Sequence, residues 1–226
     1  MPRGLALMGD AYREKNLGLK PQRSDTYEAG VNFNYHGLES SLTYFYSKLE
    51  NRIAQRTSHV EDKYYLYQNL GEATRAGLEG MFSYNLRLPY SEWSFVPFGN
   101  FVYMDEYENE ETGNDLPYIS DWTINWGLRA LNKMRGFSAD LNFTYNGDQI
   151  GYDPPRHIYK KAGTKTNIGG FTVANLSVRK RIVKIGNYGD FSLKGDIRNL
   201  FDKNYAYTDT YPMPGRTFYL GLRYQY

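Results

Sequence analysis

The sequence has no cysteine, no long apolar run and no excess of one charge. Without cysteine, a disulfide scaffold, a cysteine metal cluster and a thiol nucleophile are excluded. A membrane-spanning helix needs about 18 or more consecutive apolar residues, and no run of that length occurs. The 27 basic residues are nearly balanced by 25 acidic ones. The basic footprint typical of nucleic-acid-binding proteins is therefore missing, and no nucleic-acid partner is expected.

Tyrosine, in contrast, is abundant. The chain of 226 residues contains 23 tyrosines, and 41% of its residues are hydrophobic. This composition is too apolar and too aromatic for a disordered chain, and the length suits one or two ordinary domains. The mean hydropathy is nevertheless only −0.67, so the order of the apolar residues has to indicate the class of protein.

Apolar and polar residues alternate strictly in several segments, which indicates strands with one apolar and one polar face. Most of these runs exceed the about 5–6 residues typical of globular strands. Several exceed the about 9–11 residues that a tilted membrane-crossing strand needs, which favours a large barrel. The fourth run has apolar groups on both faces, such as Phe95 and Val96, a pattern compatible with burial on both sides. Nine strands are predicted, at residues 24–35, 39–55, 64–87, 93–108, 118–131, 136–149, 168–182, 189–202 and 216–226.

The connections between these strands alternate in length, as in outer-membrane barrels. Short turns are expected at residues 36–37, 88–92, 132–135 and 183–189, and longer polar links at 57–63, 109–117, 151–169 and 203–215. Tyrosine and tryptophan recur near the strand ends, where a membrane interface holds amphipathic rings. The sequence thus predicts an all-β fold, an antiparallel transmembrane β-barrel segment of about nine strands. The aromatic residues concerned are Tyr27, Tyr35, Trp93, Tyr103, Trp122, Tyr145 and Tyr226.

Several short motifs, taken in order, resemble the C-terminal portion of TonB-dependent outer-membrane receptors. Each motif alone is weak, but their order and spacing, ending on an aromatic terminal residue, are together specific. The motifs are NLGLKP (16–21), SDTYEAG (24–30), QNLG (68–71), GLEG (77–80), LPYI (116–119), NLFDKNY (199–205) and YPMPGR (211–216).

This resemblance implies a barrel of about 22 strands around a plug, of which the nine predicted strands are an incomplete part. An odd number of strands and the lack of an export signal lead us to expect a C-terminal fragment without plug and TonB box. Residues 1–23 are then the remnant of an extracellular loop, and residues 24–226 the C-terminal portion of the barrel. The implied location is the outer membrane of a Gram-negative bacterium.

The function implied by the resemblance is uptake of a ferric siderophore or a related metal chelate such as cobalamin. The implied partners are outer-membrane lipid, the chelate substrate and the TonB energy-coupling complex, reached through the missing N-terminal part. Substrate contacts are expected from two outer loops, whose cations and tyrosines suit an anionic chelate. The candidate substrate-binding residues are Arg156, His157, Tyr159, Tyr207 and Tyr211.

The terminal strand carries a further signal. Its alternating apolar residues resemble the signal that the outer-membrane assembly machinery reads, and they also suit contact with lipid. These residues are Phe218, Leu220, Leu222, Tyr224 and Tyr226. Charges on the polar face of the strands are expected to line the lumen, and they are given no role in a site. These are Glu79, Arg129, Asp140, Arg179, Lys194, Asp196, Arg198 and Arg223.

No catalytic set is found, so no enzyme, cofactor or metal site is expected. The histidines His36, His59 and His157 stand alone in turns or loops, without metal-ligand spacing. Asn199 and Asp202 are interpreted as architectural residues of the last loop. Two alternatives remain open: a self-contained small outer-membrane barrel of porin or adhesin type, whose first and last strands pair, and a truncated gene product without present function.

Overall fold

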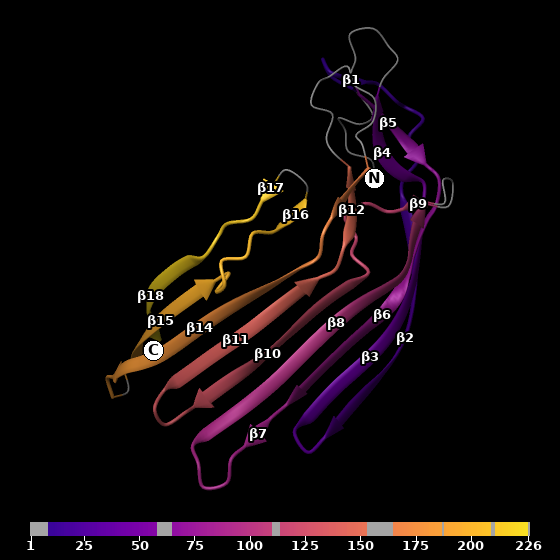
Figure 1. Ribbon diagram of the computed structural model, residues 1–226. Coiled ribbons are helices and arrows are strands. Elements are labelled where there is room, and N and C mark those ends of the chain that lie inside the picture. The colour runs from indigo at the N-terminus through magenta and orange to yellow at the C-terminus, as the bar shows by residue number, and fades with distance from the viewer. Residues whose placement is uncertain are drawn as a thin grey trace.

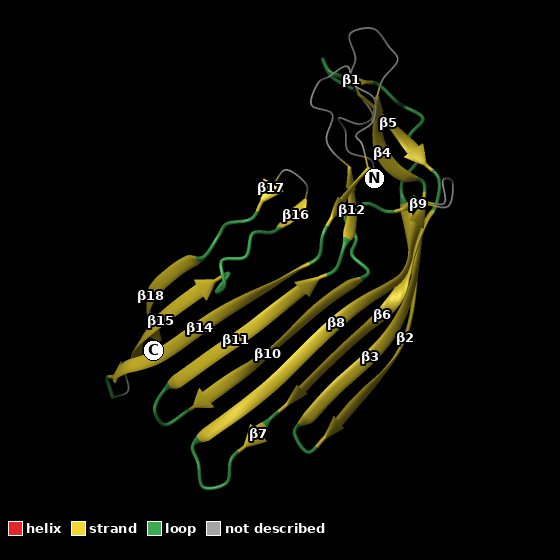
Figure 2. Cartoon of the chain, viewed as in Figure 1, coloured by secondary structure: helices red, strands yellow, loops and turns green. Residues whose placement is uncertain are grey.

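Nine long strands form one antiparallel sheet in the computed structural model, which describes residues 9–57, 65–109, 114–152, 165–186, 188–208 and 211–225 (Figures 1 and 2). Each strand pairs with the one before and the one after it along the chain, which confirms the predicted meander. Short β7 (Leu86–Arg87) and β9 (Asn114–Asp115) also pair with β8. The nine are β2 (Arg23–Tyr35), β3 (Leu38–Glu50), β6 (Ala73–Tyr84), β8 (Trp93–Asn109), β10 (Trp122–Asn132), β11 (Phe137–Asn146), β14 (Phe171–Lys184), β15 (Asp190–Arg198) and β18 (Thr217–Gln225).

The sheet is open, with β2 and β18 as its two edges. Figure 1 shows the short turns together at one end of the strands, near the C-terminus. None of the described segments is a helix long and apolar enough to cross a membrane.

The longer links lie at the opposite end, and each contains additional short strands (Figure 1). β1 pairs in parallel with β5, which pairs in turn with β4, and two further ladders join β12 to β13 and β16 to β17. These short strands are β1 (Arg13–Glu14), β4 (Arg52–Thr57), β5 (Tyr65–Leu70), β12 (Gln149–Tyr152), β13 (Lys165–Ile168), β16 (Ala206–Thr208) and β17 (Tyr211–Pro212).

Four strands were predicted as continuous, and this was wrong because each is interrupted in the structure. The run predicted at 39–55 breaks at Asn51, whose positive φ of 52° turns the backbone between β3 and β4. The Asn69 side chain holds this break, because its Nδ2 donates to the Asn51 carbonyl at 2.8 Å. The runs at 64–87, 136–149 and 168–182 break similarly at residues 71–72, 147–148 and 169–170.

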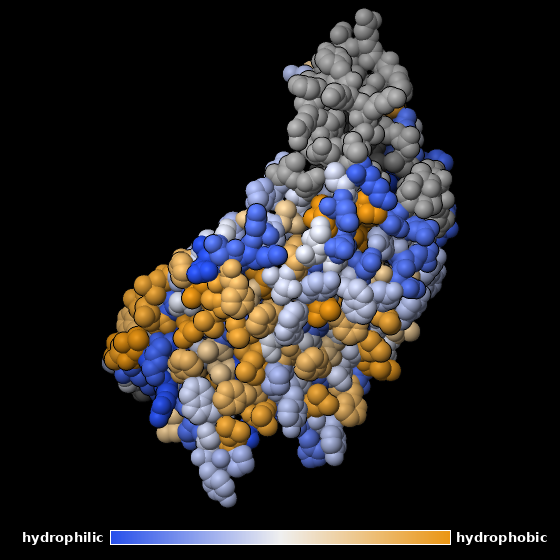
Figure 3. All heavy atoms as spheres, in the orientation of Figure 1, coloured by the Kyte–Doolittle hydropathy of each residue, from blue (hydrophilic) through white to orange (hydrophobic). Residues whose placement is uncertain are grey.

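The pairing register separates the strands into two faces. Leu128, Leu141 and Leu176 occupy neighbouring positions on one face, here called the outer face. Arg129 and Asp140 lie opposite each other on the second, inner face, with Arg129 Nε 2.9 Å from Asp140 Oδ2. The register places all eight predicted lumenal charges on this inner face. Over the middle strands, the face toward the viewer in Figure 3 is broadly hydrophobic, and hydrophilic residues gather near the end with β9.

Aromatic rings cover three glycines in the middle of the sheet. A Cβ on Gly80 would lie 2.3 Å from the Phe101 ring, and one on Gly127 would lie 2.6 Å from the Phe98 ring. Gly99 is covered in the same way by Phe82. The burial of both faces that the sequence of the fourth strand left open is not observed. Phe95 on the outer face and Phe98 on the inner face are only partly buried, and the Phe98 ring covers Gly127 of the neighbouring strand.

Candidate ligand-binding site

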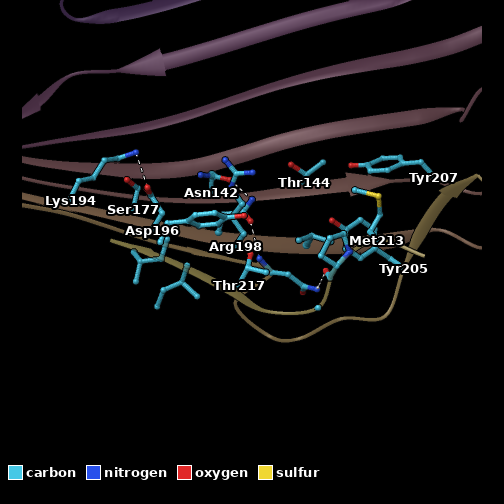
Figure 4. A pocket seen from close by; sticks show the side chains of 18 residues that line it. Asn142, Thr144, Ser177, Lys194, Asp196, Arg198, Tyr205, Tyr207, Met213 and Thr217 are labelled. Carbon is cyan, nitrogen blue, oxygen red and sulfur yellow. Dashed lines mark hydrogen bonds and ion pairs between the residues drawn. The ribbon is translucent and has the colours of Figure 1, made fainter. Parts of the chain in front are cut away.

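A hollow of about 480 Å³ lies against β11, β14, β15 and β18, beneath the loop that joins β15 to β18. Figure 4 shows Lys194 and Asp196 at one end and Tyr205, Tyr207 and Met213 at the other, with Arg198 and Thr217 between them. Polar side chains of alternate residues form its wall, because every second residue of a strand faces the same side. These wall residues are Asn142, Thr144, Asn175, Ser177, Thr217 and Tyr219.

Two cations and one carboxylate set the charge of the hollow. Lys194 Nζ lies 2.9 Å from Asp196 Oδ2. The Arg198 guanidinium carbon lies 5.0 Å from the centre of the Tyr219 ring, within cation–π range. Both cationic side chains remain exposed, so they are accessible to an anionic ligand.

The loop above the hollow is held by Asn199, which is 2% exposed and has a positive φ of 51°. Its Oδ1 accepts from the Lys203 amide at 2.7 Å, and its Nδ2 donates to the Lys203 carbonyl at 2.8 Å and the Pro214 carbonyl at 3.3 Å. Asp202 Oδ1 accepts from the Arg216 amide at 2.7 Å, next to the start of β18. These bonds agree with the architectural interpretation of both residues.

Three aromatic rings pack at the loop end of the hollow. The Phe171 ring lies 4.6 Å from that of Tyr205 and 5.0 Å from that of Tyr207. Gln149 Nε2 donates to the Tyr207 carbonyl at 2.5 Å, which ties this loop to β12. Burial, followed by the neighbouring Tyr207, raises the pKa of Tyr205 above its ordinary value. Tyr205 therefore presents a neutral phenol at physiological pH.

Asparagine and threonine side chains connect the hollow to the middle of the inner face. Thr144 Oγ1 donates to Asn125 Oδ1 at 2.7 Å, and Asn125 Nδ2 donates to Asn100 Oδ1 at 3.0 Å. On the other side, Asn175 Nδ2 donates to Asn142 Oδ1 at 3.0 Å. The polar side chains of this wall therefore hydrogen-bond one another across neighbouring strands.

Of the predicted substrate-binding residues, Tyr207 lines the hollow. Tyr211 is 70% exposed, belongs to the β16–β17 hairpin and does not line it. The other three, Arg156, His157 and Tyr159, lie outside the described residues. Their binding role stays a prediction.

The apolar residues of the terminal strand, Phe218, Leu220, Leu222 and Tyr224, lie on the outer face, opposite Ile197, Gly195, Leu193 and Phe191 of β15. Tyr226 lies outside the described residues. The placement suits contact with lipid, and the assembly role of this strand stays a prediction.

Among the described residues, no group of three or more potential His, Asp or Glu ligands is arranged to hold a metal ion. His36 occupies the β2–β3 turn with a φ of 45°, and its ring contacts Tyr35. His59 and His157 lie outside the described residues.

Lys194, Asp196 and Arg198 were predicted as inner-face charges without a role in a site. The polar wall residues Asn142, Thr144 and Asn175 were not predicted as site residues. The alternation of each strand already places these residues on the inner face, but only the register shows that residues of separate strands lie beside one another.

The architecture and the inner-face hollow correspond to one class of protein. A family model described as "TonB dependent receptor-like, beta-barrel" matches residues 3–200. The chain belongs to this family, which confirms the resemblance. The relatives of the chain are receptors and transporters, not enzymes. As a member of the TonB-dependent receptor family, the chain belongs to the outer membrane of a Gram-negative bacterium.

Individual relatives come from several bacteria. The ferrienterobactin receptor of Escherichia coli (strain K12) is 29% identical over 96% of this chain and 31% of the receptor. The ferric enterobactin receptor of Pseudomonas aeruginosa is 27% identical over 93% of this chain and 30% of its own length. The vitamin B12 transporter BtuB of Photobacterium profundum is 22% identical over 93% and 31%. The chain thus spans about a third of the length of the curated relatives it matches.

Solved structures show the same fold. A mutant of the Pseudomonas aeruginosa ferric enterobactin receptor PfeA, in complex with enterobactin, has a TM-score of 0.70 and 27% identity, over 93% of this chain and 32% of that one. The copper transporter OprC has a TM-score of 0.71 over 98% of this chain and 35% of that one, but at 18% identity it supports the fold alone. The open sheet therefore corresponds to part of a TonB-dependent receptor barrel.

Proposed function

We propose that this chain forms part of the barrel wall of a TonB-dependent uptake receptor for a ferric siderophore, and that the hollow under the last loop contacts the ligand. The hollow carries the proposal, because it combines two exposed cations with aromatic and amide groups on the inner face. The enterobactin receptors of Escherichia coli and Pseudomonas aeruginosa are relatives over most of the chain.

The chemistry of the hollow suits a large anionic chelate. Lys194 and Arg198 outnumber the single carboxylate of Asp196, so the site attracts negative charge. Tyr207 adds flat aromatic surface, and the amide side chains supply both donors and acceptors. A ligand entering past the loop meets the tyrosines first and the cations deeper on the wall.

The remaining parts of the function rest on the family. We propose that uptake is coupled to the TonB complex through a part of the receptor beyond this chain, and that residues 1–23 belong to the extracellular loops. β1 supports this placement of residues 1–23, because it pairs with β5 at the end of the sheet where the longer links lie. The outer face supports contact with outer-membrane lipid.

The test is binding of ferric enterobactin to the protein purified in detergent, measured by quenching of its intrinsic fluorescence. Arg198→Gln is expected to weaken binding about tenfold, the effect of losing one charged hydrogen-bonding group. Tyr207→Ala is expected to cause a smaller loss. The matched control is Arg223→Gln, which removes an inner-face arginine outside the hollow and should leave the affinity unchanged.

Two results would contradict the proposal. If Arg198→Gln and Arg223→Gln weaken binding equally, general charge on the inner face is responsible. If neither variant changes the affinity, the hollow does not contact the ligand.

Cobalamin is the second candidate ligand, favoured by the similarity to BtuB. It lacks the strong negative charge of a ferric catecholate, so its binding should not depend on Arg198. Saturable binding of cyanocobalamin, together with no binding of ferric enterobactin, would favour this alternative.

The expectation of a self-contained small barrel is less well supported. It requires pairing of β2 with β18, whereas these strands are the two edges of the described sheet.

A further inference from the structure

The outer face holds a groove on the other side of the strands from the inner-face hollow, with which it shares the lining residues Leu176, Asp196, Ile197 and Tyr219. Its volume is about 400 Å³, and it crosses β14, β15 and β18. We call it the Gly195 groove, after the glycine at its centre. Its apolar lining comprises Leu176, Val178, Gly195, Ile197, Phe218 and Leu220.

Gly195 is unlike the other outer-face glycines of the sheet interior. Cβ atoms on Gly80 and Gly99 would collide with the rings of Phe101 and Phe82, so the protein itself fills those gaps. A Cβ on Gly195 would find no atom within 4 Å. The space over Gly195 is therefore open to a group from outside the protein.

Cationic and apolar residues gather near the turn end of the same strands. Lys180 lies on the outer face of β14, two residues beyond Val178, which is about 7 Å along a strand. Its Nζ donates to the Arg135 carbonyl at 2.5 Å, which joins it to the β10–β11 turn. We call the exposed residues around it the Lys180 patch: the cations Arg135 and Lys180 and the apolar Met134, Ile182, Val183 and Ile185.

The mixture of charge and apolar surface indicates a membrane boundary. Met134 is 69% exposed and Ile182 61% exposed, although both are apolar. Lysine and arginine at such a boundary extend their charged ends toward headgroups while their stems remain in apolar surroundings. Asp190 pairs in register with Lys184 on the inner face and accepts a hydrogen bond from Ser192, so it does not offset the charge of the patch.

We propose that the Gly195 groove and the Lys180 patch together bind one anionic phospholipid. The phosphate of the headgroup lies at the Lys180 patch, and an acyl chain runs along β14 into the groove. Short turns of outer-membrane barrels face the periplasm, so the lipid belongs to the periplasmic leaflet. This inference is independent of the transported ligand.

The test uses the protein purified in a non-ionic detergent and an equimolar mixture of phosphatidylglycerol and phosphatidylcholine with identical acyl chains. Retained lipid is identified by native mass spectrometry. The unchanged protein is expected to prefer phosphatidylglycerol. Lys180→Gln and, separately, Arg135→Gln should each reduce this preference about fivefold. Glutamine at position 180 keeps a donor for the Arg135 carbonyl, and Arg135→Gln leaves that carbonyl in place, so the pair separates charge from turn structure.

A substitution that fills the Gly195 groove tests whether the acyl chain binds there. Gly195→Leu is expected to lower retention of both lipids while the preference for phosphatidylglycerol persists. The matched control is Ala29→Leu, which adds an outer-face leucine on β2, far along the sheet, and should leave retention unchanged. Equal retention of the two lipids by the unchanged protein, retention of detergent alone, or an unaltered preference in both Lys180→Gln and Arg135→Gln would overturn the proposal. So would equal losses in Gly195→Leu and Ala29→Leu.

Discussion

The middle strands of the sheet and its C-terminal strands differ in how the space over their glycines is filled. In β6, β8 and β10, the gaps over Gly80, Gly99 and Gly127 are filled by phenylalanine rings from neighbouring strands. In β15 and β18, Cβ atoms on Gly195 and Gly221 would meet no atom within 4 Å. In the middle region, side chains of the protein therefore fill the space over these glycines, whereas the C-terminal region leaves such space open on both faces.

This difference matches the location of the proposed sites. The outer-face groove contains Gly195, and the inner-face hollow lies against the same strands. Cross-strand aromatic contacts stabilise the middle region, while hydrogen bonds from Asn199 and Asp202 organise the loop of the C-terminal region. Stability and binding are thus expected to respond to substitutions in different regions.

The largest effect on stability is expected from Gly127→Ala. The new Cβ would lie 2.4 Å from the Leu141 carbonyl oxygen and 2.6 Å from the Phe98 ring, and a backbone atom cannot move aside easily. We expect a loss of about 3 kcal/mol in the free energy of unfolding, the upper end for overpacking. Denaturant unfolding in phospholipid vesicles measures it, with Gly195→Ala as the matched control. A similar loss in both variants would remove the contrast between the two regions.

An intermediate effect is expected from Asn199→Ala. This change removes the side-chain bonds to the Lys203 amide and to the Lys203 and Pro214 carbonyls. We expect a cost of about 2 kcal/mol, confined to the last loop. Limited proteolysis should then cut residues 199–216 faster, while denaturant unfolding of the sheet changes little. Unchanged proteolysis would show that the loop does not depend on Asn199.

The smallest effect is expected at alkaline pH. Burial raises the pKa of Tyr205 above its ordinary value of 10.0, so the folded loop holds the phenolic proton more tightly than the unfolded chain does. The stabilising contribution is complete below about pH 10 and is lost as the pH rises through the folded-state pKa. Loop proteolysis should therefore accelerate above pH 10, and Tyr205→Phe should abolish that acceleration. An equal acceleration in the variant would place the titrating group elsewhere.

Much of the fold followed from the sequence. Alternation in segments such as 26–35 determined which residues share a face, because side chains of a strand point to opposite sides in turn. Link lengths predicted which strand ends lie together, and the meander order confirmed it. The breaks at Asn51 and at residues 147–148 did not follow, because they depend on hydrogen bonds from distant residues such as Asn69.

The candidate site was predictable only in part. Tyr207 was identified from its loop, and Arg198 was placed on the inner face by alternation. Their position on one hollow with Asn142 depends on the register between β11, β14 and β15, which sequence spacing does not reveal.

The sequence by itself determined that this protein is a β-sheet with one apolar and one polar face, because a period of two runs through most of its long strands. Only the tertiary structure decided which gaps are filled and which stay open. Gly127 and Gly195 look alike in the sequence, yet a phenylalanine ring from the neighbouring strand covers one and no atom covers the other. The physical reason is that such contacts join residues far apart in the chain, and only the pairing of strands brings them together.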